Sequence, residues 1–486
     1  MFLLNFIIIF AVVSVYQGQN FSSDGYGIYP LGLEDNVSTY YSSYRFSGAL
    51  ILKFLCVFNH NFFDNCTLDT LVFAVIACTG LSVFAVSFNN MLHVSEEKRR
   101  ITLILTDLTL LIAVMNPSTA NHLTFPECMI LLGAGFFLTF LTASIFVRKT
   151  HFWTYIIAYV LIIVLTGIFQ QFYALFAVLL ITVCSVKCIQ DDKSGIAASL
   201  KHYVAPAGCY ILSGLSYFII AKLLIKYLGI EGNVRADFTV QTLISKAVTY
   251  LTRQFYIWKG SGSIDSYKVK MLLASVTVGF FLVSLIYIVF RLIRKKQIAK
   301  SIVVFFALLT AYSLAFLPGI IESMPGVNVR TILGFYSIFF MFAGLCAASG
   351  DIPKAVYPPV IAVMTAVLCL FIFIMTGKEL ENKVGNTADN IWAKQIIYEI
   401  DRYQEENDVK IANVYICDDG DPQLNYMFIE WSRDGILKVF DSNNNYDVSE
   451  MTEEEQKRVF DNKTWEHFDA DEQLVFDGDT LYVCAY

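Results

Sequence analysis

Apolar segments long enough to cross a lipid bilayer recur along most of this chain, and they limit its fold more than any other feature. A helical span needs about 20 predominantly apolar residues. Hydrophobic residues make up 56% of the 486 residues and charged residues only 16%. We therefore predict an all-α polytopic membrane protein with about 11 transmembrane helices. The predicted spans are Phe2–Tyr16, Leu68–Phe88, Ile101–Met115, Cys128–Val147, Phe152–Gly167, Phe172–Val186, Tyr203–Tyr227, Met271–Leu292, Ile302–Leu317, Ile332–Ala348 and Ala355–Thr376.

Basic residues in the connections predict how these spans are oriented. With 11 spans, every basic cluster falls on one side, which the positive-inside rule makes cytoplasmic together with the N-terminus. The clusters are Lys98–Arg100, Arg148 with Lys149, Lys187 with Lys193, and Arg291–Lys300. The polar and aromatic loops then lie outside. We expect a multi-pass protein of a bacterial plasma membrane that works at its outer face.

The composition changes at Lys378, where the hydrophobic segments end. Roughly 26 acidic against 10 basic residues follow. This change predicts two domains, a membrane domain at 1–377 and a small, acidic, extracytoplasmic α/β domain at 378–486. We expect helices at Ala388–Glu406, with Thr387 as N-cap, and at Met451–Phe460. The expected strands are Val409–Cys417, Ile436–Phe440, Gln473–Phe476 and Leu481–Ala485, the last two joined by a hairpin turn. A disulfide between Cys417 and Cys484 is left open.

The loop after the first span contains the residue types that sugar-phosphate chemistry needs. Glu34 and Asp35 offer a general base, Tyr44 an aromatic stacking surface and Arg45 a phosphate clamp. The alternative is a solvated loop whose acids only face water. We expect Ser38–Arg45 and Ala49–Phe58 to form one amphipathic helix along the membrane interface.

Four further residues on the predicted outer side could line the same site. His122 and Glu127 flank the entry to the fourth span, Gln171 lies in the turn of a helical hairpin, and Arg330 precedes a span where a helix N-terminus would favour phosphate. The alternatives are a hydrogen-bonding histidine in a turn and an arginine that reaches the lipid headgroups. The sequence predicts no cofactor firmly, since no cluster has metal-ligand spacing, and it leaves a divalent cation open.

Four stretches together resemble the Gtr type II family of bacterial glucosyltransferases, which belongs to the GT-C class of multi-span glycosyltransferases. They are LEDNVSTYYSSYRFSGALI, NPSTANHLTFPECMILLGAGFFL, VLTGIFQQFYALFAVLLI and SGLSYFIIAKLLIKYLGI. The resemblance extends over roughly residues 1–377 in layout and does not include the tail. It implies a GT-C-like fold and a membrane enzyme that transfers a hexose, glucose by resemblance, from a polyprenyl-phosphate carrier to a cell-surface glycan such as O-antigen or cell-wall polysaccharide.

Under this reading the partners are the lipid-linked sugar donor, the glycan acceptor and the bilayer, with no nucleic acid. Glu34 or Asp35 would deprotonate an acceptor hydroxyl, which then attacks the anomeric carbon with inversion. The sequence does not separate the two acids. The alternative function is a transporter or flippase of lipid-linked sugars that forms no bond. Such proteins tend to contain two matching halves, and no such repeat is visible in this sequence.

Overall fold

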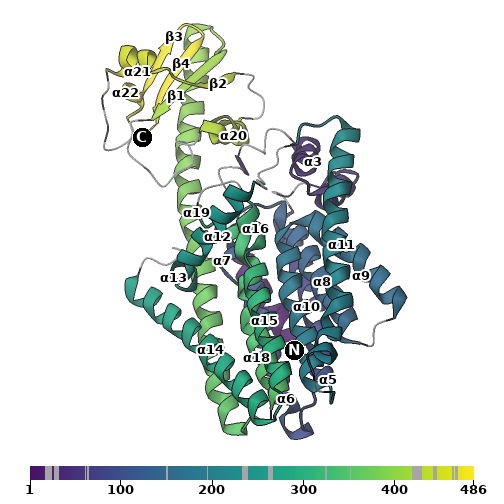
Figure 1. The fold of residues 1–486 in the computed structure, drawn as a ribbon. Helices are drawn as coiled ribbons and strands as arrows, with labels where there is room; N and C mark the ends of the chain where they lie inside the picture. Colours follow the sequence, from purple (N-terminus) through teal and green to yellow (C-terminus); the bar gives the residue numbers. More distant parts are fainter. Residues whose placement is uncertain are drawn as a thin grey trace. The chain divides into compact units, whose positions relative to one another are not determined.

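A computed structural model describes the chain except at residues 17–24, 27–31, 61, 63–64, 149–150, 194, 233–238, 261–265, 323–325, 351, 419–429, 442–445, 462, 464, 466–468 and 486. The backbone of residues 32–36, 430–431 and 485 is described without their side chains. Most of the described chain is helical (Figure 1). It divides into two compact units, which are treated separately below.

The larger, membrane unit comprises Met1–Val15, Val37–Leu123 and Glu127–Thr376. All 11 predicted apolar segments are helical there. The corresponding helices are α1 (Phe2–Val13, extended by η1, Ser14–Tyr16), α5 (Cys66–Met91), α6 (Glu96–Val114), α8 (Cys128–Val147), α9 (Phe152–Ile168), α10 (Gln171–Gln190), α11 (Ile196–Leu228), α14 (Tyr267–Arg294), α15 (Ile298–Leu314), α18 (Ile338–Ser349) and α19 (Tyr357–Asn407).

Not all of these helices are long enough to cross a bilayer. Within the described chain, seven helices qualify by length and composition, and α6 with α7 (Pro117–Leu123) makes an eighth if this bent pair is one span. Phe2–Tyr16, Phe152–Ile168 and Ile298–Leu314 are apolar but shorter. The protein is therefore a polytopic helical membrane protein, while 11 spans and their orientation remain predictions.

Short helices fill the connections of the membrane unit. They are the part of α3 (Gly32–Ser42) from Val37 onward, α4 (Phe46–Cys56), α12 (Val240–Thr252), α13 (Gln254–Trp258), α16 (Leu317–Ile321), η3 (Val329–Ile332), α17 (Leu333–Tyr336) and η4 (Lys354–Val356). The single amphipathic helix predicted from Ser38 onward is wrong. It is two helices, because the chain turns sharply at Tyr44, whose φ is +63°.

Small residues let the central helices of this unit approach closely. A Cβ at Gly80 of α5 would lie 2.7 Å from the Phe137 backbone of α8, and one at Gly135 of α8 would overlap the Phe172 ring of α10. Close backbone approach of this kind is typical of membrane helices, which gain little from the hydrophobic effect within lipid. In Figure 1, α8, α10 and α11 lie side by side. Packing of these helices buries Phe136, Phe140 and Phe172 completely.

The smaller unit comprises Gly377–Tyr486 together with Tyr16–Asn36 and Thr124–Pro126. Its described strands form one sheet in the order β2 (Asp447–Glu450), β1 (Asn413–Asp418), β4 (Thr480–Ala485) and β3 (Leu474–Asp477). The outer pair β3–β4 is the predicted antiparallel hairpin, and its turn residue Gly478 has φ +61°. Strand β1 pairs in parallel with both β2 and β4. The sheet and its helices confirm an α/β fold in the tail.

Three details of the tail differ from prediction. Ile436–Phe440 is the end of helix α20 (Glu430–Phe440) rather than a strand, and β2 was not predicted. Thr387 is not an N-cap, because α19 continues through it and its hydroxyl donates to the carbonyl of Lys383.

The predicted Met451–Phe460 helix is present as α21 (Glu453–Phe460), followed by the short α22 (Ala470–Gln473). Cys417 and Cys484 are register partners in β1 and β4, and both are free thiols.

Candidate functional site

One buried asparagine creates the bend on which the candidate site is built. Asn116 lies between α6 and α7, whose axes differ by 45°. Its amide nitrogen donates to the Ala113 carbonyl (2.9 Å), and its amide oxygen accepts from the backbone N–H groups of Ser118 (3.0 Å) and Thr119 (3.1 Å). The side chain thus satisfies orphan groups at both helix ends, and Pro117 fits the first helical position because it needs no N–H partner there.

Helix α7 presents His122 to the start of α10. The Nδ1 atom of His122 lies 2.8 Å from the carbonyl oxygen of Ser118, which can only accept, so Nδ1 carries the proton. The Nε2 atom lies 2.7 Å from the amide nitrogen of Gln171, which donates. This pair of contacts defines a neutral imidazole with a buried ring. The Gln171 amide oxygen is buried and has no hydrogen-bond partner among the described residues.

A strained turn between α3 and α4 positions Arg45. The N–H of Arg45 bonds to the Tyr40 carbonyl (2.8 Å) and that of Tyr44 to the Tyr41 carbonyl (3.0 Å), which is the Schellman pattern of a helix end. Glycine usually occupies the left-handed position that Tyr44 holds here. Two side chains from other helices fix the turn.

These two side chains are Gln170 and Tyr217. Gln170 donates to the Ser43 carbonyl (3.1 Å) and to the Tyr217 hydroxyl (2.9 Å), and Tyr217 donates to the Tyr44 carbonyl (2.8 Å). Strained backbone persists only where surrounding contacts over-determine it, and it is common at functional sites. The contacts therefore hold the start of α4 firmly against α9, α10 and α11.

The guanidinium of Arg45 lies over two neighbouring aromatic rings, whose centres are 6.2 Å apart. Its carbon is 4.9 Å from the centre of the Phe169 ring and 5.7 Å from that of Tyr40. The Nε atom is buried and lacks a hydrogen-bond partner among the described residues. Aromatic faces stabilise the cation and hold its plane without using its N–H donors. Arg45 is thus held in place while donors remain for an anion.

Tyr40 and Glu127 lie close to each other and to Cys128 at the start of α8. The Tyr40 hydroxyl lies 3.4 Å from the Cys128 sulfur. Burial raises the pKa of Tyr40 well above its usual value, and Cys128 and Glu127 raise it further, so Tyr40 is a neutral phenol. Glu127 is buried at the N-cap position of α8, beside Tyr40 and Cys128.

Arg330 approaches the same residues from η3. The Asn328 side chain accepts from the Arg330 N–H (3.0 Å), and the Arg330 carbonyl accepts from the Ser118 hydroxyl (3.1 Å). The guanidinium groups of Arg330 and Arg45 both interact electrostatically with His122 and with the Cys128 thiol. Two cations from residues 285 positions apart in the sequence therefore face one small buried region, here called the His122 cluster.

The His122 cluster, defined as Arg45, His122, Glu127, Gln171 and Arg330 with the rings of Tyr40 and Phe169, offers two kinds of recognition. The arginines can bind an anion through charge-assisted hydrogen bonds. The Gln171 oxygen can bind a hydroxyl group, and so can the buried hydroxyl of Thr119, which lies on the same helix as His122; neither atom has a hydrogen-bond partner among the described residues. A ligand with both an anionic and a hydroxylated part would satisfy them together.

Five of the eight predicted site residues thus lie in this cluster: Arg45, His122, Glu127, Gln171 and Arg330. Tyr44 instead acts through its backbone, and its half-buried ring packs against a group that includes Phe46 and Tyr217. Glu34 and Asp35 fall in the first turn of α3, but their side chains lie outside the described residues.

The sequence alone did not reveal several residues that build the cluster. Asn116, Ser118, Thr119, Cys128 and Tyr217 were not predicted. For Asn116 a signal was present, since Asn followed by Pro is the N-cap and first position of many helices. Among the described residues, no group of three or more His, Cys, Asp or Glu side chains could hold a metal ion.

Fold and site together define a class, a polytopic helical membrane protein with a buried cluster of cationic, amide and aromatic groups in its membrane unit. Comparison with protein-family models finds no match. Comparison with curated protein sequences finds none either.

Proposed function

We propose that the protein is a membrane glycosyltransferase that moves a hexose, glucose by resemblance, from a polyprenyl-phosphate carrier to a cell-surface glycan on the outer face of the membrane. The observation that carries this proposal is the His122 cluster. It combines two arginines with buried hydroxyl-binding groups that have no partner in the described part of the chain, inside an apolar helical unit. A lipid-linked sugar phosphate has an apolar chain, a phosphate and hydroxyl groups, and it would use all three features.

The donor phosphate would bind Arg45 and Arg330. Arginine suits a phosphate because its planar fork donates two parallel hydrogen bonds. Arg45 is half-buried beside the Tyr40 and Phe169 rings, and a charge interaction is stronger there than in bulk water. Cations at this position also stabilise the negative charge that gathers on the phosphate as it leaves.

The sugar would lie against Gln171 and Thr119. Gln171 can accept a hydrogen bond from a sugar hydroxyl through its free oxygen while its nitrogen stays on His122. A site built to bond a hydroxyl discriminates well against analogues that lack it, because the buried partner is then left unpaired.

The transfer itself needs a base. A carboxylate, Glu34 or Asp35, would take the proton of the acceptor hydroxyl as the acceptor oxygen bonds to C1 of the sugar. The bond between C1 and the phosphate oxygen breaks in the same step, and its electron pair leaves with polyprenyl phosphate. Attack opposite to the leaving group inverts C1. A positioned base contributes about 10²- to 10⁴-fold to such a rate.

The test is sugar transfer by the purified protein in proteoliposomes, from polyprenyl-phosphate glucose to a surface-glycan extract. We expect transfer by the wild type and a loss of about 10²-fold or more in either Glu34→Gln or Asp35→Asn, with carrier binding retained. Glu231→Gln, which changes an exposed acid of the membrane unit, is the matched control and should transfer normally.

Other outcomes reject the proposal in different ways. If the wild type moves several carrier-linked sugars across the bilayer and transfers none, the protein is a flippase. If both carboxylate variants transfer at the wild-type rate, neither Glu34 nor Asp35 is the base.

A further inference from the structure

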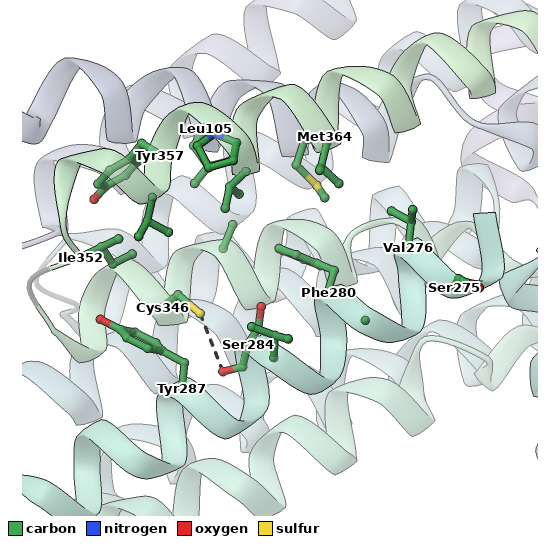
Figure 2. A pocket seen from close by; sticks show the side chains of 17 residues that line it. Leu105, Ser275, Val276, Phe280, Ser284, Tyr287, Cys346, Ile352, Tyr357 and Met364 are labelled. Atoms are coloured by element: carbon green, nitrogen blue, oxygen red, sulfur yellow. Dashed lines mark hydrogen bonds between the residues drawn. The ribbon is translucent and has the colours of Figure 1, made fainter. Parts of the chain in front are cut away.

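A second feature of the membrane unit, far along α6 from the His122 cluster, is an apolar cavity of about 440 Å³ between α6, α14, α18 and the start of α19. Its walls include Leu105, Phe280, Ala343, Val360 and Met364 (Figure 2). Its volume lies in the range of about 300–1,000 Å³ that is typical of pockets for small ligands. Nearly all of its lining is hydrocarbon, so a hydrocarbon chain is the chemistry that it fits.

The cavity opens to the side of the helical unit. Val283 of α14, Val356 of η4 and Val363 of α19 line it, and these side chains are 68%, 42% and 41% exposed. Helices α14 and α19 are both candidate membrane spans. The exposed apolar rim therefore faces lipid, and a chain can enter from the bilayer without crossing water.

One end of the cavity is basic. Figure 2 shows Tyr287, Ile352 and Tyr357 together at one end, and Ser275 and Val276 at the other. Arg291, one helical turn beyond Tyr287, has its guanidinium carbon 6.0 Å from the centre of the Tyr287 ring. The buried Lys98 donates to the Ile352 carbonyl (2.9 Å). Positive charge thus lies where a chain that fills the cavity would carry its headgroup.

Arg291 has donors available at this end. Its Nε atom is buried and has no hydrogen-bond partner among the described residues, although Arg291 packs against Gly350, where a Cβ would lie 2.3 Å from Nε. An arginine that is fixed by packing, and whose Nε has no partner in the described part of the chain, is suited to a phosphate. Basic pockets between membrane helices commonly bind anionic lipid headgroups.

The basic end cannot serve the donor site proposed above. Lys98 lies in the first turn of α6, whereas His122 follows the other end of this 19-residue helix. At 1.5 Å per residue the helix is about 28 Å long, close to the thickness of the bilayer hydrocarbon core. A headgroup at Arg291 therefore belongs to the leaflet opposite to the His122 cluster.

We propose that the cavity binds one acyl chain of an anionic glycerophospholipid from that leaflet, with the lipid phosphate on Arg291. This inference rests on the cavity and its charge and is independent of the proposed sugar transfer. The bound lipid fills space between α14 and α19 and neutralises Arg291.

The experiment measures retained lipid on the purified full-length protein by native mass spectrometry, after equal exposure to phosphatidylglycerol and phosphatidylcholine with the same acyl chains. We expect the wild type to retain phosphatidylglycerol preferentially. Arg291→Gln should lower this retention about 10-fold or more. Arg294→Gln, an exposed arginine in the same last turn of α14, is the charge control and should retain it.

A second pair of variants tests the cavity itself. Gly279→Phe fills it from α14, where nothing lies within 4 Å of an added Cβ, and should abolish retention. Gly208→Phe makes the same change on α11 in equally open space, away from the cavity, and should retain the lipid. If Gly279→Phe is not monodisperse in detergent, Ala343→Leu replaces it.

Three results would overturn the proposal. They are equal retention of the two lipids by the wild type, full retention of phosphatidylglycerol in the cavity-filling variant, and displacement of phosphatidylglycerol from the Arg291 end by polyprenyl phosphate.

Discussion

Two arginines at opposite ends of the membrane unit have nearly the same local setting and different surroundings. Arg45 lies over Phe169 and Arg291 over Tyr287, and the Nε atom of each is buried without a hydrogen-bond partner in the described chain. Around Arg45 are a second arginine, a neutral histidine and an amide. Beside Arg291 is an apolar cavity that opens sideways.

The difference indicates that the surroundings of a half-buried arginine select its ligand. An aromatic face can hold a guanidinium in either place, so the cation alone predicts only an anion. The hydroxyl-binding groups near Arg45 suit a sugar attached to the anion, whereas the apolar cavity beside Arg291 suits an acyl chain attached to it. The predictions below test whether the two regions differ in this way.

The largest expected effect is on transfer, through loss of the Arg45 guanidinium. Arg45→Gln should lower kcat/KM for the polyprenyl-phosphate donor by about 10- to 100-fold, because a charged hydrogen bond to phosphate is lost. Initial rates over a range of donor concentrations measure it. Lys53→Gln removes an exposed cation from the last turn of the same helix, α4, and a comparable loss there would contradict a specific role for Arg45.

A smaller effect is expected from Gln171→Leu, which removes the free amide oxygen. KM for the donor should rise about 10-fold while kcat changes less, if the oxygen binds a sugar hydroxyl in the ground state and transition state alike. The control is Gln190→Leu at the other end of α10. With its amide flipped, Gln190 donates to the Met91 carbonyl (3.0 Å) and accepts from the His93 N–H (2.8 Å), so its loss costs stability in a similar way. An equal rise in KM for Gln190→Leu would mean that Gln171 acts only through folding.

The smallest effect concerns the turn that positions Arg45. Tyr44→Ala and Tyr44→Gly both remove the ring, but only glycine relieves the left-handed backbone. The glycine variant should be more stable than the alanine variant by roughly 1 kcal/mol, measured as a shift in Tm in detergent.

Tyr41, which lies in the last turn of α3 and has no positive φ, provides the internal comparison. The Tyr41→Gly variant should be less stable than the Tyr41→Ala variant by about 0.5–1 kcal/mol. If the glycine variant were less stable than the alanine variant at position 44 as well as at position 41, the backbone at Tyr44 would not be strained.

The sequence predicted the helices well, because apolar content alone specifies a membrane helix. The predicted Cys128–Val147 matches α8 at both ends, and Phe152–Gly167 differs from α9 by one residue. Short apolar runs are harder to assign. Ile436–Phe440 is helical although it was predicted as a strand, since a run of five residues carries no clear period. Thr387 has the residue type of an N-cap, but it lies inside α19, which continues on both sides of it.

The site was predictable as a set of residues and not as an arrangement. His122, Gln171 and Arg330 were each proposed from residue type and position, and His122 and Arg330 each had a structural alternative. Their convergence depends on the 45° bend at Asn116 and on the turn at Tyr44, and a sequence pattern fixes neither. Asp107 shows the same limit, because its buried carboxylate accepts a hydrogen bond from the Asn5 amide (2.8 Å), 102 residues away in the sequence.

The most direct test of the central claim locates the donor by photocrosslinking. A benzophenone amino acid replaces Phe169 in the His122 cluster in one protein and Phe280 in the apolar cavity in another, and each is irradiated with labelled polyprenyl-phosphate glucose. We predict that label enters the protein at position 169 and is competed by unlabelled donor, with little at position 280. Competable label at position 280 and none at position 169 would contradict the assignment of the His122 cluster as the donor site.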